Sequence, residues 1–141
     1  MFSYSRTVHF YETDSMRVVH HANYIKFMEE ARIAWAKANG FMSYQKVEEA
    51  SQFAVIECHV RYLKPAFFAE ELQIDIQAKL EGIRLFFEYK IFSKNRNHLL
   101  LTEGRTVHAN VDENLQLKRP SQELTMITEK QKWIETWLLN L

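Results

Sequence analysis

The sequence predicts an α+β fold in which one long helix packs on a five-stranded antiparallel sheet. Apolar residues recur every three or four positions in one segment, whereas most of the other segments alternate and are β-prone. The connections between the strand segments are too short for the crossovers that parallel strands need. With 3 glycines and 2 prolines, the 141 residues leave little room for a linker. We therefore expect a single domain over residues 1–141.

The N-terminal third combines the first strand with the long helix. Residues 4–12 (YSRTVHFYE) are β-prone and predict a strand. The helical pattern covers residues 22–39, and Gly40 follows it as a C-terminal stop signal. Residues 43–50 predict a second, short helix. The apolar face of the long helix consists of Tyr24, Phe27, Met28, Ala31, Ala34, Trp35 and Ala38.

The remaining strands form one run in the second half of the chain. Short turns around Pro65, Gly82 and residues 94–97 separate them. Residues 113–124 read as a loop, and residues 128–141 predict a C-terminal helix that begins with a Thr-x-x-Gln cap. The four predicted strands cover residues 52–65, 70–82, 83–94 and 98–112.

The bulk composition excludes several classes of function. Eighteen basic and eighteen acidic residues cancel, so no net field favours a nucleic-acid partner. No apolar run approaches the roughly 20 residues of a membrane span. Cys58 is the single cysteine, which favours a reducing compartment, and the polar N-terminus lacks a signal-peptide pattern. We expect a soluble, cytoplasmic protein without cofactor or metal.

Asp14 and His21 lie on either side of the predicted connection between the first strand and the long helix. The first N–H groups of a helix lack internal partners and favour an anion, including the oxyanion formed when a carbonyl is attacked. A carboxylate beside them can activate water or attack the carbonyl itself. These parts suit hydrolysis of an activated ester or thioester. Taken alone, each residue is more commonly a turn or surface residue.

Residues 10–32 (FYETDSMRVVHHANYIKFMEEAR) resemble the signature of the hotdog-fold acyl-CoA thioesterases of the 4-hydroxybenzoyl-CoA thioesterase type, close to the YbgC-like branch. The matching elements are Thr-Asp at 13–14, VVHHANY at 18–24 and EEAR at 29–32. Residues 60–74 and 111–124 also resemble that family. The resemblance implies a long central helix wrapped by an antiparallel sheet, an acyl-CoA substrate, and homodimers or homotetramers built from paired dimers.

The resemblance also implies roles for three residues. Asp14 takes the place of the catalytic carboxylate, as nucleophile or general base. His21 takes the position whose backbone N–H polarises the thioester carbonyl, with a supporting role for its side chain. Arg17 stands where the family has glycine. This arginine implies either a different loop path or an added cation near the substrate.

Weaker candidates lie elsewhere in the chain. Glu12 precedes Asp14 by two residues and reads as a strand-end acid. Tyr24 belongs to the apolar helix face, as core or as lining of an acyl tunnel. Glu29 and Arg32 are one helical step apart, so a structural ion pair is expected. The basic residues of two predicted loops are expected to meet the CoA phosphates: Lys94, Arg96, Lys118 and Arg119.

These observations predict an acyl-CoA thioesterase that releases a free acid and a thiol. A thioesterase acting on acyl carrier protein is the alternative within the same chemistry. A non-catalytic hotdog module that binds acyl-CoA is a rival, although it has no need of Asp14 beside a thioester. A hotdog dehydratase is disfavoured, because the local motif resembles the thioesterase form. Aromatic, short and long acyl groups all suit a tunnel lined by Phe and Met.

Overall fold

The computed structural model describes residues 1–45 and 53–141. Most of the predicted short helix over residues 43–50 lies outside the described residues, and residues 43–45 are not helical. The described elements are β1 (Phe2–Thr7), the 3-10 turn η1 (Phe10–Glu12), α1 (His21–Ala38), β2 (Phe53–Tyr62), β3 (Glu71–Glu81), β4 (Arg84–Ser93), β5 (Leu99–Asn110) and α2 (Gln122–Lys130).

The five strands form one antiparallel sheet in the order β1-β3-β4-β5-β2. The four strands predicted in the second half are confirmed to within a few residues at each end. The first strand is shorter than the predicted 4–12, because pairing with β3 stops at Thr7. The next residue, Val8, donates its N–H to the carbonyl of Glu70 instead. The chain then turns through η1 toward the start of α1.

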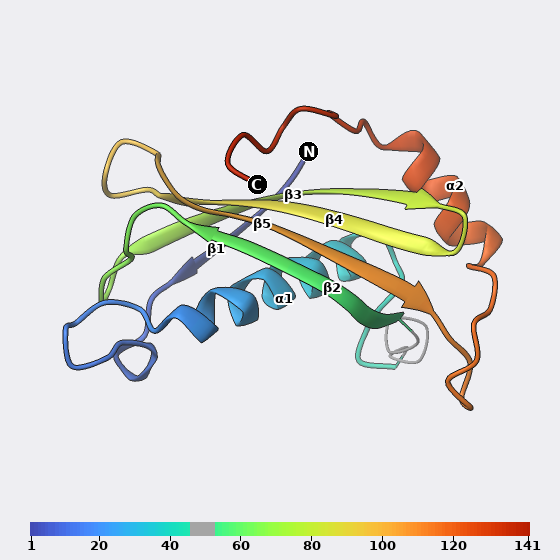
Figure 1. The fold of residues 1–141 in the computed structure, drawn as a ribbon, viewed down its shortest axis with the longest axis horizontal. Helices are drawn as coiled ribbons and strands as arrows, with labels where there is room; N and C mark the ends of the chain where they lie inside the picture. The colour runs from blue at the N-terminus through green and yellow to red at the C-terminus, as the bar shows by residue number, and fades with distance from the viewer. Residues whose placement is uncertain (46–52) are drawn as a thin grey trace.

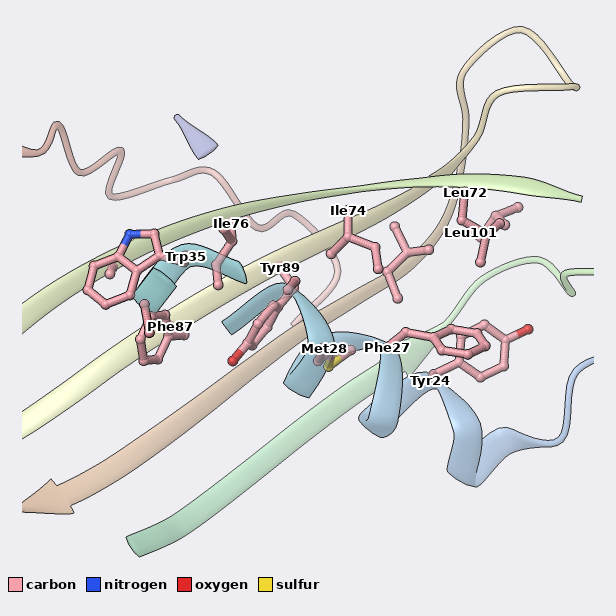
Figure 2. Close-up of a cluster of buried hydrophobic side chains, with 14 of the residues drawn as sticks. Tyr24, Phe27, Met28, Trp35, Leu72, Ile74, Ile76, Phe87, Tyr89 and Leu101 are labelled. Carbon is pink, nitrogen blue, oxygen red and sulfur yellow. The ribbon is translucent and has the colours of Figure 1, made fainter. Parts of the chain in front are cut away.

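α1 lies along one face of the sheet (Figure 1), and its apolar face supplies six of the twenty buried core residues among those that the structure describes. The predicted helix over 22–39 is confirmed with a shift of one residue. Its end is a Schellman motif: Gly40 at φ +80° donates to the carbonyl of Lys37, and Phe41 donates to that of Ala36. In Figure 2, the α1 side chains Tyr24, Phe27, Met28 and Trp35 lie among Leu72, Ile74, Ile76, Phe87, Tyr89 and Leu101 of the sheet.

Gly104 in β5 lets α1 approach the sheet closely. A Cβ atom at this position would overlap the thioether sulfur and methyl group of Met28. Met28 is fully buried, so it has little space into which it can move. The glycine therefore sets how tightly the middle of α1 packs on the sheet.

The predicted short C-terminal helix is present, but its predicted bounds, 128–141, are wrong. α2 covers Gln122–Lys130, and residues 131–141 continue without helix along the sheet face opposite α1 (Figure 1). Ser121 caps α2 by accepting the N–H of Leu124, so the predicted loop ends at residue 121. The actual N-cap, Ser121, lies seven residues before Thr128, the first residue of the Thr-x-x-Gln sequence that predicted the helix start.

Polar side chains on the outer sheet face explain why residues 131–141 leave the helical path. Gln77 of β3 bonds both the N–H and the carbonyl of Ile134. Glu103 of β5, fully buried, accepts the N–H groups of Leu139 and Asn140. These side chains satisfy backbone groups that a helix would otherwise pair internally. Tertiary hydrogen bonds thus override the local helical spacing.

Candidate active site

Asp14 lies in a tight loop that joins η1 to α1. Thr13 and Val19 form a bridge across its base, and Asp14 donates its N–H to the carbonyl of Val18 at 2.9 Å. Arg17 donates to the carbonyl of Asp14 at 2.9 Å and has φ +66°. A three-residue hairpin loop ends in such a left-handed residue, which is usually glycine. The loop therefore keeps a backbone shape that favours glycine, although arginine occupies the position.

The carboxylate of Asp14 is fixed at one oxygen. Oδ1 accepts the N–H of Met16 at 2.8 Å, an Asx turn within the loop. Within the described ranges, Oδ2 has no hydrogen-bond partner. The side chain is half-buried at the surface. Asp14 thus has a defined orientation and one oxygen that can accept a proton or attack a carbon atom.

The N-terminus of α1 follows this loop directly. His20 is the N-cap, and its Nδ1 accepts the N–H of Ala22 at 3.2 Å, while its carbonyl accepts that of Asn23. The backbone N–H of His21 has no acceptor among the described residues. Tyr62 at the end of β2 donates its hydroxyl to the carbonyl of His21 at 2.8 Å, which fixes this turn against the sheet. A helix N-terminus with a free N–H favours a developing negative charge.

Glu12, which reads as an ordinary strand-end acid in the sequence, anchors the Asp14 loop. Its carboxylate accepts two hydrogen bonds from buried Arg6, at 2.7 and 2.8 Å, and one from the N–H of His9. Its carbonyl accepts the N–H of His20 and the side-chain amide of Asn23. Burial opposes ionisation of Glu12, but the bonds from Arg6 and His9 outweigh it and lower the pKa of this carboxyl group.

Arg6 joins this anchor to α1. Its guanidinium also bonds Glu30 at 2.9 Å and lies 4.0 Å over the ring of Phe27. Tyr4 donates to the same carboxylate of Glu30 at 2.8 Å. One buried arginine therefore ties β1, the Asp14 loop and α1 together. Sequence spacing gave no sign of this arrangement, because Arg6 and Glu30 are 24 residues apart and meet only in the folded chain.

Arg17→Gly is expected to raise the free energy of unfolding by about 1 kcal/mol, because a left-handed backbone is costly for a residue with a Cβ atom. Chemical denaturation of both proteins measures the difference. Arg17→Ala is the control, since alanine removes the guanidinium but keeps the Cβ atom. Equal stability of the glycine and alanine variants would contradict a strained Arg17.

Tyr24 lies in the core beneath the candidate site. Its hydroxyl accepts the N–H of Ala66 at 3.0 Å, and its ring packs against Phe27 and Tyr62. The phenol is almost fully buried, and burial, the leading cause, raises its pKa. This side chain supports the loop of residues 63–70 next to the Asp14 loop. Its contact with substrate stays a prediction.

Lys94 and Arg96 belong to the turn between β4 and β5. This turn lies at the same end of the molecule as the loop that leads into α1 (Figure 1). Lys94 is exposed. Arg96 donates two hydrogen bonds to the buried carboxylate of Glu70 and one to the carbonyl of Pro65. The charge of Arg96 is therefore largely compensated within the subunit. The expected contact of both residues with CoA phosphates stays a prediction.

Lys118 and Arg119 lie elsewhere, beside a cavity of about 590 Å³ near the C-terminal half of α1. Arg32 also lines this cavity and donates to the hydroxyl of Tyr89 at 3.2 Å. Within the described ranges Arg32 forms no ion pair, so the expected Glu29–Arg32 pair is absent there.

Two further findings concern the described residues alone. They contain no cluster of three or more His, Cys, Asp or Glu side chains arranged to hold a metal ion. None of their helices has the length and apolarity needed to cross a bilayer.

Residues 8–135 match the model of the thioesterase-like superfamily. The chain is 29% identical over 113 residues to the acyl-CoA thioester hydrolase YbgC of Escherichia coli, an alignment that covers 79% of this chain and 83% of that protein. A crystal structure of a protein from Aquifex aeolicus superposes with a TM-score of 0.81 at 27% identity, covering 91% of this chain and 99% of the other.

The fold is shared more widely. A 1,4-dihydroxy-2-naphthoyl-CoA thioesterase from Synechocystis superposes with a TM-score of 0.80 at 20% identity, covering 92% of this chain and 96% of that one. The chain belongs to the thioesterase-like superfamily and has the hotdog fold. The resemblance inferred from residues 10–32 is thereby confirmed.

Proposed function

We propose that this protein is an acyl-CoA thioesterase, with Asp14 as nucleophile or general base and the N-terminus of α1 at His21 as oxyanion donor. One observation carries the proposal. The loop that holds Asp14 by one carboxylate oxygen leads directly into a helix whose first N–H has no partner among the described residues. Membership of the thioesterase-like superfamily and the name of the E. coli relative support the reaction class.

The reaction requires attack on the thioester carbonyl and departure of the thiolate. As general base, Asp14 removes a proton from water while the water oxygen adds to the carbonyl carbon. As nucleophile, its free Oδ2 adds to that carbon and forms an anhydride, which water then hydrolyses. In both routes the carbonyl oxygen becomes negative, and the N–H of His21 donates to it. The C–S bond then breaks, and the thiolate takes up a proton.

The same arrangement serves an acyl carrier protein thioester, which differs in the carrier and not at the reacting carbon. A binding module without catalysis is the rival from another class. The oriented Asp14 carboxylate favours the enzyme, because an anion beside an electron-rich thioester oxygen adds nothing to binding.

The decisive experiment measures thiol release from a panel of acyl thioesters. The panel contains 1,4-dihydroxy-2-naphthoyl-CoA, benzoyl-CoA, acetyl-CoA, decanoyl-CoA and decanoyl acyl carrier protein. Hydrolysis of at least one CoA thioester well above the uncatalysed rate is expected, and the ranking identifies the acyl class. Faster turnover of the carrier protein thioester than of decanoyl-CoA would support the alternative. Binding without release of thiol would overturn the enzyme.

We propose further that the protein is a homodimer, or a tetramer of paired dimers. β2 is an edge strand, paired on one side with β5, and an exposed edge of ten residues invites pairing with another strand. Glu57, His59 and Arg61 alternate along it on the side away from α1 and are exposed. If two copies pair antiparallel about a two-fold axis at His59, Glu57 lies opposite Arg61 of the partner subunit.

Light scattering is expected to give at least twice the subunit mass at micromolar concentration. Arg61→Glu places like charges opposite one another at that edge and is expected to weaken the assembly. The double variant Glu57→Arg/Arg61→Glu restores opposite charges and is expected to recover it. A stable wild-type monomer, or a double variant no better than the single one, would contradict this edge pairing.

A further inference from the structure

The first three backbone N–H groups of α1 lie beyond the reach of its helical hydrogen bonds, and His20 accepts two of them. Nδ1 of its imidazole accepts the N–H of Ala22 at 3.2 Å, and its carbonyl accepts that of Asn23 at 2.9 Å. The N–H of His21 has no acceptor in the described parts of the chain. His20 therefore determines which N–H of this turn stays available to a ligand.

An imidazole is an unusual helix cap. Serine, threonine, aspartate and asparagine, the preferred N-cap residues, accept through an oxygen atom. A histidine ring nitrogen accepts only where it carries no proton, so Nδ1 of His20 is unprotonated and the proton of the neutral ring lies on Nε2. A second proton would turn Nδ1 into a donor that faces the N–H of Ala22. The cap thus requires a neutral His20 in one tautomer.

Of the two adjacent histidines, His20 supplies the side-chain hydrogen bond at this turn. Both rings are exposed, and their centroids lie 4.2 Å apart. The ring of His20 accepts the N–H of Ala22, whereas the ring of His21 forms no hydrogen bond with the residues that the structure describes. The side-chain support of the helix start therefore comes from the residue before the proposed oxyanion donor.

The backbone of His20 is fixed independently of its side chain. Its N–H donates to the carbonyl of Glu12 at 3.0 Å, and the side-chain amide of Asn23 donates to the same carbonyl at 2.8 Å. Tyr62 holds the carbonyl of His21 from the end of β2. Loss of the imidazole alone therefore leaves the path of the chain into α1 in place and frees the N–H of Ala22.

We propose that His20 is a positioning residue for the thioester hydrolysis proposed above, on which this role rests. Its neutral imidazole holds the N–H of Ala22, so the N–H of His21 stays free and points in one direction for the carbonyl oxygen. An oxyanion donor is most effective when it is oriented before the charge develops. Without the cap the first turn opens more readily, and this orientation is lost while the groups that bind the substrate are unchanged.

Two substitutions at one position test the role in catalysis. His20→Ala removes the acceptor, and it is expected to lower kcat for the preferred acyl-CoA about fivefold to tenfold, the scale of one helix cap, with KM near wild type. His20→Asn supplies one of the strongest cap residues and is expected to restore most of the lost turnover. His98→Ala is the control for loss of an exposed imidazole, because its ring stacks on Phe92 in the turn between β4 and β5. It is expected to change neither kinetic constant.

NMR measurement of the exchange of single backbone amides tests the cap without turnover. In the wild-type protein the N–H of Ala22 is expected to exchange more slowly than that of His21. This protection is expected to be lost in His20→Ala and kept in His20→Asn. Nitrogen NMR spectra of the imidazole are expected to show neutral His20 with its proton on Nε2.

Each measurement can overturn the proposal. A proton on Nδ1 of neutral His20, or equal exchange of Ala22 in the wild-type protein and in His20→Ala, removes the cap. Unchanged kcat in His20→Ala beside lost protection of Ala22 leaves a cap that only stabilises the helix, which contradicts a positioning role. A raised KM in both variants makes His20 a substrate contact instead. If the wild-type protein hydrolyses no thioester, the proposed function and the positioning role fail together, whereas the exchange rates still decide the cap.

Discussion

Asp14→Asn is expected to lower the turnover of the preferred acyl-CoA at least ~100-fold and to leave the fold intact. Removal of a principal acid–base or nucleophilic group has an effect of this size. Asparagine keeps the side-chain oxygen that accepts the N–H of Met16, so the Asx turn survives. Steady-state kinetics under saturating substrate, beside circular dichroism of both proteins, measures the two parts of the expectation.

Asp112 provides the matched control for this substitution. Its Oδ1 accepts the N–H of Asn114 at 2.8 Å, the same Asx turn that Asp14 makes with Met16. Asp112→Asn removes an equal charge from an equivalent turn outside the proposed catalytic centre, and turnover is expected to stay near wild type. Near-normal turnover of Asp14→Asn, or an equal loss in both variants, would refute a catalytic role for Asp14 and revive the binding module.

Arg6→Met is expected to destabilise the protein by about 3–5 kcal/mol, the cost of leaving buried charge without its partner. The arginine side chain is 8% exposed, as is that of Glu12, and both bonds between them are lost in the variant. The pKa of Glu12 is lowered in the folded protein, so this stability is present above the ordinary pKa of the carboxyl group. It is lost as the pH falls through the lowered value. Urea denaturation at neutral and acidic pH measures both effects.

A double-mutant cycle separates the ion pair from simple loss of packing. Arg6→Met/Glu12→Gln removes both charges, so it is expected to be more stable than Arg6→Met alone. Glu30 keeps its bond from Tyr4 and is 36% exposed, so water solvates much of its remaining charge. The cycle is completed by Glu12→Gln alone. If the losses of unfolding free energy in Arg6→Met and Glu12→Gln sum to the loss in the double variant, Arg6 and Glu12 do not act as a pair. The anchor of the Asp14 loop is then not electrostatic.

Helices and strands were predictable from the sequence where the spacing of their apolar residues matches the face that they bury. α1 carries a full apolar stripe and ends at Gly40, and both signals survive in the structure because the stripe has a sheet to cover. The strands β2 to β5 follow from alternation and short turns. The C-terminal segment was not predictable. Trp133, Ile134, Trp137 and Leu138 have helical spacing, but Gln77 and Glu103 offer its backbone hydrogen bonds that no local pattern reveals.

The candidate site also has features that the sequence revealed and features that only the structure revealed. The residue types and spacing of Asp14 and His21 within the motif were sufficient to select them, and their contribution to catalysis stays a prediction. The sequence also showed that Arg17 replaces a glycine, whereas only the structure showed that its backbone keeps the left-handed angle that glycine favours. Glu12 and Arg32 carried no sign of their partners, since Arg6 and Tyr89 reach them from separate strands.

By itself the sequence determined the α+β class, the thioesterase family and the long helix that follows the Asp14 loop, because these depend on neighbours within a few turns of chain. Tertiary structure alone decided the path of residues 131–141, the buried anchor beneath Asp14, and the gathering of Arg32, Tyr89, Thr106 and His108 beside one cavity. The physical reason is distance along the chain. Residues as far apart as 32 and 108 meet only after strand pairing has fixed the sheet, and the hydrogen bonds between them form only where burial has excluded water.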